Sequence, residues 1–280
     1  MASLGRLDAI NILGIRIHSV TRSDVFNYID FALNSPFFPR PLFIATVNPS
    51  FILKAQKNKE FKDILNNKTS LNVVDGIGVK MAFHYLKSVS KESTVFSKLY
   101  RGFYTGVSTG FSNKNTHLVP QVVTGIELTK YLLRIANKNN KRVLIVNRKD
   151  GMVSEKELKR YINLKYSKLN YSILSIPLSQ YKTKIVDYGK SHIDILICTL
   201  GEVFEEIFIS ENLNKVCPGV AIGVGGTFDL LINKFRSTKT LYNSQGLKWL
   251  DRLLHNPKRG FKIFKSAVLF PLKVFLYSLS

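Results

Sequence analysis

Residues 193–199 read Ile-Asp-Ile-Leu-Ile-Cys-Thr, an almost continuous apolar segment of strand length. Such a segment is typical of a strand that is buried on both faces, because a strand with one solvated face would alternate apolar and polar residues. Strands of this kind occur in parallel sheets that carry helices on both sides. The segment therefore predicts an α/β fold built on a parallel sheet.

Segments on either side of it alternate between strand and helix signals. Short β-rich segments occur at residues 42–47, 71–74, 142–146, 171–176 and 220–224. Helical spacing is found at residues 49–66, from about residue 76, and at residues 125–139, 154–166, 179–188 and 203–213. Strands that alternate with helices predict Rossmann-like α/β layers around a parallel sheet.

Two regions depart from this alternation. Residues 87–120 are rich in Ser, Thr, Gly, Lys and aromatic residues with little periodicity, so we interpret them as an insertion or a long loop. The tail after residue 231 has ten Lys and Arg residues against one acid, Asp251. We therefore divide the chain into an α/β domain at residues 1–230, which includes the insertion at 87–120, and a basic C-terminal appendage at residues 231–280.

The charge of the chain restricts its partners. Its 280 residues include 41 Lys and Arg against 19 Asp and Glu, a formal net charge of +22. Such an excess attracts nucleic acid, an anionic membrane surface or a phosphorylated substrate, although a genome biased toward Lys and Asn codons would also produce it. No nucleic-acid partner is expected, because the sequence has no helix-turn-helix, RRM or zinc-finger signature.

Other classes of protein are disfavoured by what the sequence lacks. The two cysteines, Cys198 and Cys217, form neither a CxxC pair nor a disulfide framework, so a reducing compartment is expected. The histidines have no HExxH or HxxxH spacing, and no GxSxG motif indicates a hydrolase. We expect no transmembrane helix, since no stretch of eighteen apolar residues occurs, and residues 1–20 lack a signal-peptide pattern.

Polar residues close two of the predicted strands. Thr46 and Asn48 lie at the end of the strand at residues 42–47, and Asp75 directly follows the next one. Because the carboxyl ends of parallel strands line the ligand crevice, these three residues could meet in one pocket. A carboxylate there could deprotonate a substrate hydroxyl. The alternative is turn chemistry, since Asn-Pro and Asp-Gly are common turn dipeptides.

A glycine-rich segment at residues 223–229 follows the last predicted strand and contains Gly225, Gly226 and Asp229. Successive backbone N–H groups in such a segment can hold phosphate oxygens. The segment matches neither the P-loop nor the dinucleotide-binding fingerprint. The alternative is an ordinary turn between a strand and a helix.

A second candidate segment, Gly201 to Glu206, follows the apolar strand at residues 193–199. Glu205 and Glu206 could bind sugar hydroxyls there. They could equally be acids in the first turn of a helix, where the helix dipole favours negative charge.

The tail combines cationic and apolar residues. Arg252 and Arg259 could fork onto a diphosphate with paired hydrogen bonds. Apolar residues then alternate with Lys and Arg over residues 258–269, as in a basic amphipathic helix that lies in a membrane interface. Pro271 and Lys273 argue against a membrane span. The alternative is a C-terminal helix that packs on its own core.

The order of the motifs T-x-N-P, D-G-I-G-V, V-T-G-x-E, G-V-G-G-x-F-D and G-L-x-W-x-x-R-L-x-x-x-P-x-R resembles the WecG/TagA/CpsF glycosyltransferases (glycosyltransferase family 26). The resemblance extends from about residue 11 to residue 259. It implies a hexosyltransferase that moves a sugar from a UDP-sugar to a polyprenyl-diphosphate-linked acceptor saccharide, with inversion and without a required metal. It also implies a bacterial cytosolic protein, held peripherally at the inner face of the plasma membrane by the C-terminal appendage.

The resemblance implies roles for single residues as well. Asp75 matches the family's proposed catalytic base, and Thr46 and Asn48 match its polar pocket residues. Arg252 and Arg259 match appendage arginines expected near the acceptor diphosphate. The donor would resemble UDP-N-acetylmannosamine or a UDP-hexuronic acid, and the product would serve cell-envelope polysaccharide or exopolysaccharide synthesis. The oligomeric state stays open, with a homo-oligomer as one alternative.

The sequence departs from the family pattern G-x-P-x-Q-E at residues 201–206. Val203 stands at the place of the Pro and Glu205 at the place of the Gln. A carboxylate in place of an amide removes hydrogen-bond donors and adds negative charge. The alternative function is therefore a degenerate, non-catalytic relative that binds a nucleotide-sugar or the membrane.

Overall fold

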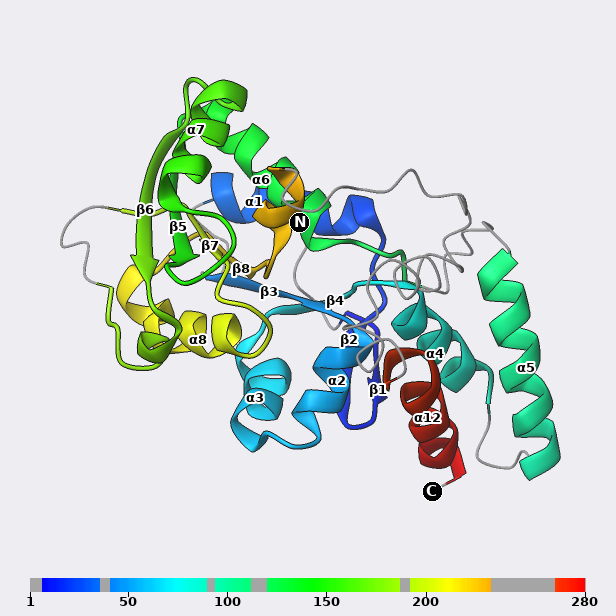
Figure 1. Ribbon diagram of the computed structural model, residues 1–280. Helices are drawn as coiled ribbons and strands as arrows, with labels where there is room; N and C mark the ends of the chain where they lie inside the picture. Colours follow the sequence, from blue (N-terminus) through cyan, green and yellow to red (C-terminus); the bar gives the residue numbers. More distant parts are fainter. Residues whose placement is uncertain are drawn as a thin grey trace.

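The computed structural model describes residues 7–35, 41–89, 94–111, 120–186, 192–232 and 265–279. A six-stranded parallel sheet in the order β4-β3-β8-β7-β5-β6 forms its centre (Figure 1). This arrangement confirms the predicted α/β fold. The strands are β3 (Leu42–Val47), β4 (Leu71–Val74), β5 (Arg142–Arg148), β6 (Asn170–Ile176), β7 (Ile195–Cys198) and β8 (Val220–Gly223).

Helices cover both faces of the sheet. In the view of Figure 1, α1, α6 and α7 lie above it, and α2, α3 and α8 lie below it. The helices are α1 (Arg22–Asn34), α2 (Pro49–Ala55), α3 (Lys59–Asp63), α4 (Ile77–Ser88), α5 (Val95–Phe111), α6 (Gly125–Asn139), α7 (Glu155–Lys165), α8 (Phe204–Val216), α9 (Thr227–Leu231) and α12 (Phe270–Leu279). Short irregular helices are η1 (Ile64–Lys68), η2 (Leu178–Gln180) and η4 (Lys265–Leu269).

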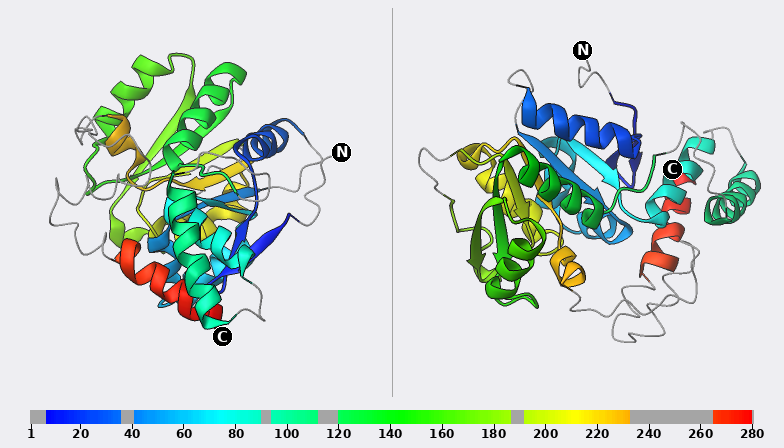
Figure 2. Two further views of the ribbon diagram at one scale, coloured as in Figure 1. Left: turned by 90° about the vertical axis from the view of Figure 1, so that its right-hand side faces the viewer. Right: turned by 90° about the horizontal axis from the view of Figure 1, so that it is seen from above.

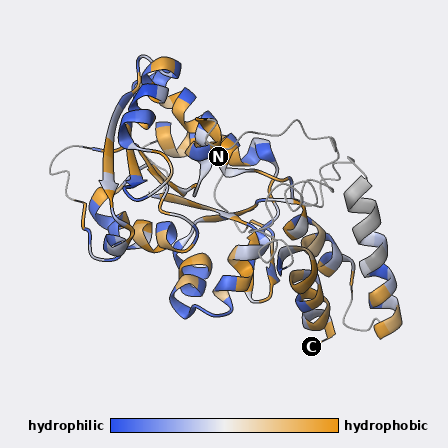
Figure 3. Cartoon of the chain, in the orientation of Figure 1, coloured by the Kyte–Doolittle hydropathy of each residue, from blue (hydrophilic) through white to orange (hydrophobic). Residues whose placement is uncertain are grey.

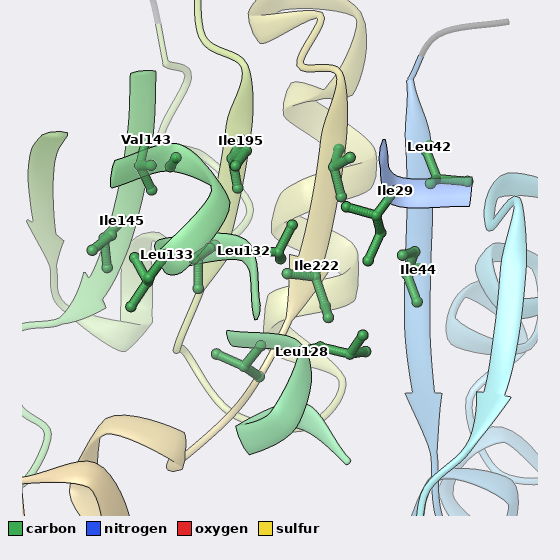
Figure 4. Packing of buried hydrophobic residues seen from close by; sticks show 14 of the residues in the cluster. Ile29, Leu42, Ile44, Leu128, Leu132, Leu133, Val143, Ile145, Ile195 and Ile222 are labelled. Atoms are coloured by element: carbon green, nitrogen blue, oxygen red, sulfur yellow. The ribbon is translucent and has the colours of Figure 1, made fainter. Parts of the chain in front are cut away.

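The core has one layer on each face because alternate strand residues point in opposite directions. On one face, Ile44 and Ile222 of neighbouring strands pack with Leu128 and Leu132 of α6 (Figure 4). On the other face, residues such as Phe43 pack against α8. Both faces of the strands are thus buried, as the apolar segment at residues 193–199 predicts.

The N-terminal residues form a hairpin that no sequence pattern predicted. Strands β1 (Ala9–Ile12) and β2 (Ile15–His18) pair antiparallel. The hairpin lies beside β4 at the end of the sheet, where the His18 ring nitrogen Nδ1 accepts a hydrogen bond from the Asn72 backbone N–H at 2.9 Å. It therefore covers an edge that would otherwise present unpaired backbone groups.

The helix at residues 154–166 begins as predicted. The Ser154 hydroxyl accepts a hydrogen bond from the Glu157 backbone N–H, and the Glu157 carboxylate accepts one from the Ser154 N–H at 3.0 Å. This reciprocal capping box starts α7.

Two predicted helices are wrong in extent. The helix predicted at residues 49–66 is divided into α2, α3 and η1, because the Asn58 side chain accepts the N–H of Phe61 and begins a new helix. The helix predicted at residues 179–188 is only the single turn η2. Beyond η2 the chain is irregular as far as residue 186, and the buried Asn212 amide oxygen accepts the Val186 N–H at 2.8 Å. Residues 187–188 lie outside the described residues.

Of the two interpretations of residues 87–120, an insertion or a long loop, the long loop is wrong for the central part. Residues 95–111 form α5, which packs on α4 and α12. Abundant Ser, Thr and Gly obscured the apolar residues that recur every three or four positions along this helix. Residues 90–93 and 112–119 lie outside the described residues.

The described part of the tail ends in α12, which packs on the α/β domain (Figure 2). Phe270 and Val274 of this helix are 1% and 2% exposed and join residues of α2 and α4 in one apolar cluster. The domain boundary at residue 230 stays a prediction. None of the helices in the described ranges combines the length and the apolarity that crossing a bilayer requires.

Candidate active site

Asn48 and Asp75 lie next to each other at the carboxyl edge of the sheet. Strands β3 and β4 pair in register, with Thr46 opposite Val73 and Val47 opposite Val74. Asn48 and Asp75 are the next residues on the two strands, and the Asp75 N–H donates to the Val47 carbonyl at 2.8 Å. The structure therefore brings these three predicted residues to one place.

Asn48 also has a structural role. Its side-chain oxygen accepts a hydrogen bond from the Phe51 N–H at 3.1 Å and caps α2, whose first residue is Pro49. The turn chemistry considered as an alternative thus applies to Asn48. The cap does not exclude a substrate contact, because the amide nitrogen of the same side chain can still donate.

The motif V-T-G-x-E, at residues 123–127, lies beside the aspartate. The Val123 N–H donates to the Val74 carbonyl at 2.8 Å, directly before Asp75. Thr124 then caps α6, and Gly125 approaches the loop after β8 so closely that a Cβ atom would lie 3.4 Å from Thr227 Oγ1. The N-terminus of α6 therefore fits between Asp75 and the glycine-rich loop.

A pocket of about 320 Å³ opens at the same edge, between the loops after β5, β7 and β8. Four predicted residues line it, namely Gly201, Gly225, Gly226 and Asp229. Sequence reasoning missed the others, which are Asn147, Arg148, Asp150, Gly151, Met152, Val153, Thr199, Leu200 and Phe228. The residues that line the pocket do not include Thr46, Asn48 and Asp75. The carboxyl edge of the sheet therefore has two groups of candidate residues, one in this pocket and one at the ends of β3 and β4.

The loop after β5 contributes an ion pair to this pocket. Arg148 Nη2 lies 2.8 Å from Asp150 Oδ2, and the Leu178 N–H donates to the other oxygen of that carboxylate. The hydrogen bond from Arg148 lowers the pKa of Asp150 to about 2. A signal for this loop was present in the sequence, since Asn147 and Arg148 directly follow the strand predicted at residues 142–146.

Glu205 lies behind the pocket and joins two of its loops. Its Oε2 atom accepts hydrogen bonds from the Gly201 N–H at 3.1 Å and the Gly225 N–H at 2.8 Å. The side chain is 2% exposed, and burial raises its pKa to about 8. These two glycine N–H groups are therefore already occupied, and phosphate oxygens would have to meet other donors of the loops.

Glu206 lies still deeper and is fully buried. Its Oε2 accepts the Val203 N–H at 2.8 Å, whereas its Oε1 is buried without a hydrogen-bond partner among the described residues. Burial raises the pKa of Glu206 well above its ordinary value, and the nearby charge of Glu205 raises this pKa further. Both acids thus belong to the support of the pocket, and their direct contact with a sugar stays a prediction.

The departures from the family pattern have a local explanation. A neutral, protonated Glu205 offers one accepting and one donating oxygen, much as a glutamine amide does. Val203 has φ of 82°, a strained value for a β-branched residue, and its N–H donates to Glu206. A proline at that position would have no N–H to donate.

The appendage arginines Arg252 and Arg259 lie outside the described residues, so their approach to a diphosphate stays a prediction. Across the described ranges, no three His, Cys, Asp or Glu side chains gather in a way that could hold a metal ion. Helices α2, α4, α6 and α8 begin near the site, and helix N-termini favour anions.

Comparison with known proteins gives a consistent result. The family model described as "Glycosyl transferase WecG/TagA/CpsF family" matches residues 10–110 and 111–280. An N-acetylglucosaminyldiphosphoundecaprenol N-acetyl-beta-D-mannosaminyltransferase of Bacillus subtilis (strain 168) is 24% identical over 260 residues, which cover 90% of this chain and 89% of the relative. A protein of the same name from Staphylococcus aureus (strain MW2) is 23% identical over 270 residues, which cover 95% of this chain and 91% of that protein.

Proposed function

Because the chain belongs to the WecG/TagA/CpsF family of glycosyl transferases, we propose that this glycosyltransferase moves a sugar from a UDP-sugar to a polyprenyl-diphosphate-linked saccharide. The names of the Bacillus and Staphylococcus relatives describe an acceptor of that kind and the transfer of N-acetylmannosamine. We therefore infer UDP-N-acetylmannosamine or a close analogue as the donor. Inversion without a required metal is part of the same proposal.

The main structural support for the proposal is the position of Asp75 at the carboxyl edge of the sheet, where the pocket also opens. Its backbone is held by the Val47 carbonyl at the end of β4, next to Asn48 and the start of α6. In the proposed step an acceptor hydroxyl attacks the anomeric carbon of the donor and gives its proton to the Asp75 carboxylate. The bond from that carbon to UDP breaks, and UDP leaves from the opposite face, which inverts the configuration.

The pocket between the loops after β5, β7 and β8 suits the nucleotide part of the donor. Its volume of about 320 Å³ lies within the range of small-molecule sites. Arg148 at the pocket has a side chain that is 37% exposed, and a guanidinium can form paired hydrogen bonds with phosphate oxygens. We propose that Arg148 and backbone N–H groups near Gly226 stabilise the charge on the leaving diphosphate.

The acceptor would approach from the membrane side. Arg252 and Arg259 are proposed to contact its diphosphate, and the basic tail is proposed to hold the enzyme at the inner face of the plasma membrane. Each Lys or Arg near an anionic leaflet contributes about 1 kcal/mol to such binding.

The test is a transfer assay with the full chain. The enzyme is incubated with an N-acetylglucosaminyl diphosphate that carries a short, water-soluble prenyl chain, and with UDP-N-acetylmannosamine, UDP-N-acetylglucosamine, UDP-glucose or UDP-glucuronic acid. We expect one donor to give product of inverted anomeric configuration, at a rate that EDTA does not change. Binding of UDP without transfer from any donor would instead favour a non-catalytic relative.

A further inference from the structure

Helix α5 is turned with its apolar side outward. Phe96, Leu99, Tyr100 and Tyr104 recur at helical spacing and are 81%, 58%, 65% and 61% exposed. A helix on the surface of a water-soluble protein normally buries such a stripe and exposes its polar residues. Here the apolar stripe faces away from the protein.

The opposite side of α5, which faces the protein, carries polar and small residues. Lys98 and Thr105 are 6% and 3% exposed, and the Lys98 ammonium donates to the Ser278 carbonyl of α12 at 2.5 Å. Gly102 lies against the ring of Tyr85 on α4. These contacts fix the orientation of the helix, so the outward position of the aromatic residues follows from packing that the structure specifies.

Helix α12 extends the same apolar surface. Val268, Leu272 and Leu276 recur every fourth residue and are 49%, 52% and 55% exposed. Helices α5 and α12 pack against each other and lie side by side at the front of the left view in Figure 2. In Figure 3 the residues of α12 are predominantly hydrophobic. We call the exposed sides of the two helices the α5–α12 face.

The charge of this region has one sign. Residues 94–111 and 265–279 contain no Asp or Glu, whereas Arg101, Lys265 and Lys273 are basic. An apolar and aromatic face on two segments whose charged residues are all basic is complementary to an anionic lipid surface. A second copy of the same face would bring like charges together, which disfavours pairing between two copies.

The position of the face relative to the site fits this partner. Helix α4 begins at Ile77, two residues after Asp75, and packs against both α5 and α12 on the side away from the sheet. Its 12 residues span about 18 Å. The helices that carry the α5–α12 face therefore pack directly on the helix that begins beside the proposed catalytic base.

We propose that the α5–α12 face rests on an anionic bilayer, with the aromatic stripe of α5 inserted at the level of the lipid headgroups. This proposal rests on the proposed function, because that function implies a lipid-linked acceptor. It adds to that function a membrane contact made by α5, in the insertion at residues 87–120, as well as by the tail. Tyrosine rings suit this interfacial position, because each joins an apolar body to a polar hydroxyl, and the phenylalanine ring adds apolar surface.

Vesicle flotation with the full chain tests the proposal. The vesicles contain phosphatidylcholine and phosphatidylglycerol in equal parts, or phosphatidylcholine alone. We expect the wild-type chain to float with the anionic vesicles, and we expect the combined change Phe96→Ser, Tyr100→Ser and Tyr104→Ser to weaken binding by about 100-fold or more. The matched control is Leu164→Ser, which removes a side chain that is 73% exposed on the remote helix α7 and should leave binding unchanged.

Two further measurements distinguish the outcomes. Transfer to the water-soluble acceptor and the midpoint of thermal unfolding should both be the same in the triple variant and the wild type, which shows that the variant is folded. Loss of vesicle binding in the triple variant supports the proposal even if the wild-type enzyme transfers no sugar. The membrane contact and the proposed transferase function are therefore tested independently. Unchanged vesicle binding overturns the proposal, and a dimer that light scattering shows to dissociate on the same change would assign the face to a subunit interface instead.

Discussion

The carboxylate of Glu205 accepts the backbone N–H of Gly225 at 2.8 Å, although Glu205 lies in the first turn of α8 and Gly225 lies in the loop after β8. The same oxygen accepts the N–H of Gly201. One buried side chain thus sets the distance between two walls of the pocket. The position that departs from the family pattern is therefore a support of the site.

Replacing Glu205 tests this support. Glu205→Ala leaves two N–H groups without their partner, and each such loss costs about 1–3 kcal/mol. We expect the free energy of unfolding to fall by about 2–6 kcal/mol and the affinity for UDP to fall with it. Glu205→Gln keeps an accepting oxygen and should retain most of both, as measured by urea denaturation and calorimetry. Equal losses in the two variants would contradict the role assigned to the oxygen.

The same residue predicts a dependence of stability on pH. Burial raises the folded-state pKa of Glu205 from about 4.5 to about 8, with Glu202, Glu206 and Cys198 close by. As the pH rises, Glu205 therefore keeps its proton to a higher pH in the folded state than in the unfolded state. This contribution to stability is complete below pH 4.5 and is lost as the pH rises through 8.

Unfolding in urea between pH 5 and pH 8 measures that dependence. A glutamine at position 205 cannot release a proton, so the stability of Glu205→Gln should fall less steeply with pH than that of the wild type. The two slopes should differ by up to about 1.4 kcal/mol per pH unit, the value for one proton. Glu60→Gln, at an exposed ion pair with Lys182, is the control and should keep the wild-type slope. Identical slopes for Glu205→Gln and the wild type would show that Glu205 is already ionised in the folded protein.

The last residue of β8 has no room for a side chain. A Cβ atom on Gly223 would lie 2.6 Å from Glu206 Oε1 and 2.7 Å from Glu205 Cγ. Gly223→Ala should therefore lower the free energy of unfolding by about 1–3 kcal/mol, because the buried acids must move. Gly102→Ala is the control, since its nearest neighbour is at 3.6 Å and alanine favours the helix by roughly 0.5–1 kcal/mol. Thermal denaturation should show a lower Tm for the first variant and not for the second.

Asn48 allows its two roles to be separated. Asn48→Ala removes the cap of α2 and should cost about 1 kcal/mol in stability, whereas Asn48→Asp retains a capping oxygen. If the amide nitrogen also contacts substrate, Asn48→Asp should keep the wild-type Tm but lower kcat/KM. Unchanged kcat/KM in Asn48→Asp would restrict Asn48 to the cap.

Sequence patterns predicted the sheet and the adjacency of two candidate site residues. Strands β3 and β4 occupy the predicted residues, and the parallel arrangement follows from the buried apolar segments. That arrangement alone was enough to expect Asn48 and Asp75 at one edge, because neighbouring parallel strands end on the same side.

Other features depend on contacts that no local pattern contains. The loop after β5 lines the pocket only because β5 lies beside β7, which is an order of strands set by packing. Glu205 holds two glycine loops because β7 and β8 are neighbours. Helix α5 was missed because its many Ser, Thr and Gly residues obscure the recurring apolar positions. That its apolar side faces outward depends on its packing against α4 and α12, which no local pattern contains.

The rate of sugar transfer by Asp75→Asn tests the central claim most directly. Asparagine keeps the size of the side chain and the backbone bond to Val47 but cannot accept the proton of the acceptor hydroxyl. With the full chain, the soluble prenyl-diphosphate acceptor and the active donor, kcat should fall by about 10²–10⁴-fold. Asp63→Asn, at an exposed aspartate on α3, should retain the wild-type rate. Equal rates for Asp75→Asn and the wild type would remove Asp75 from the mechanism.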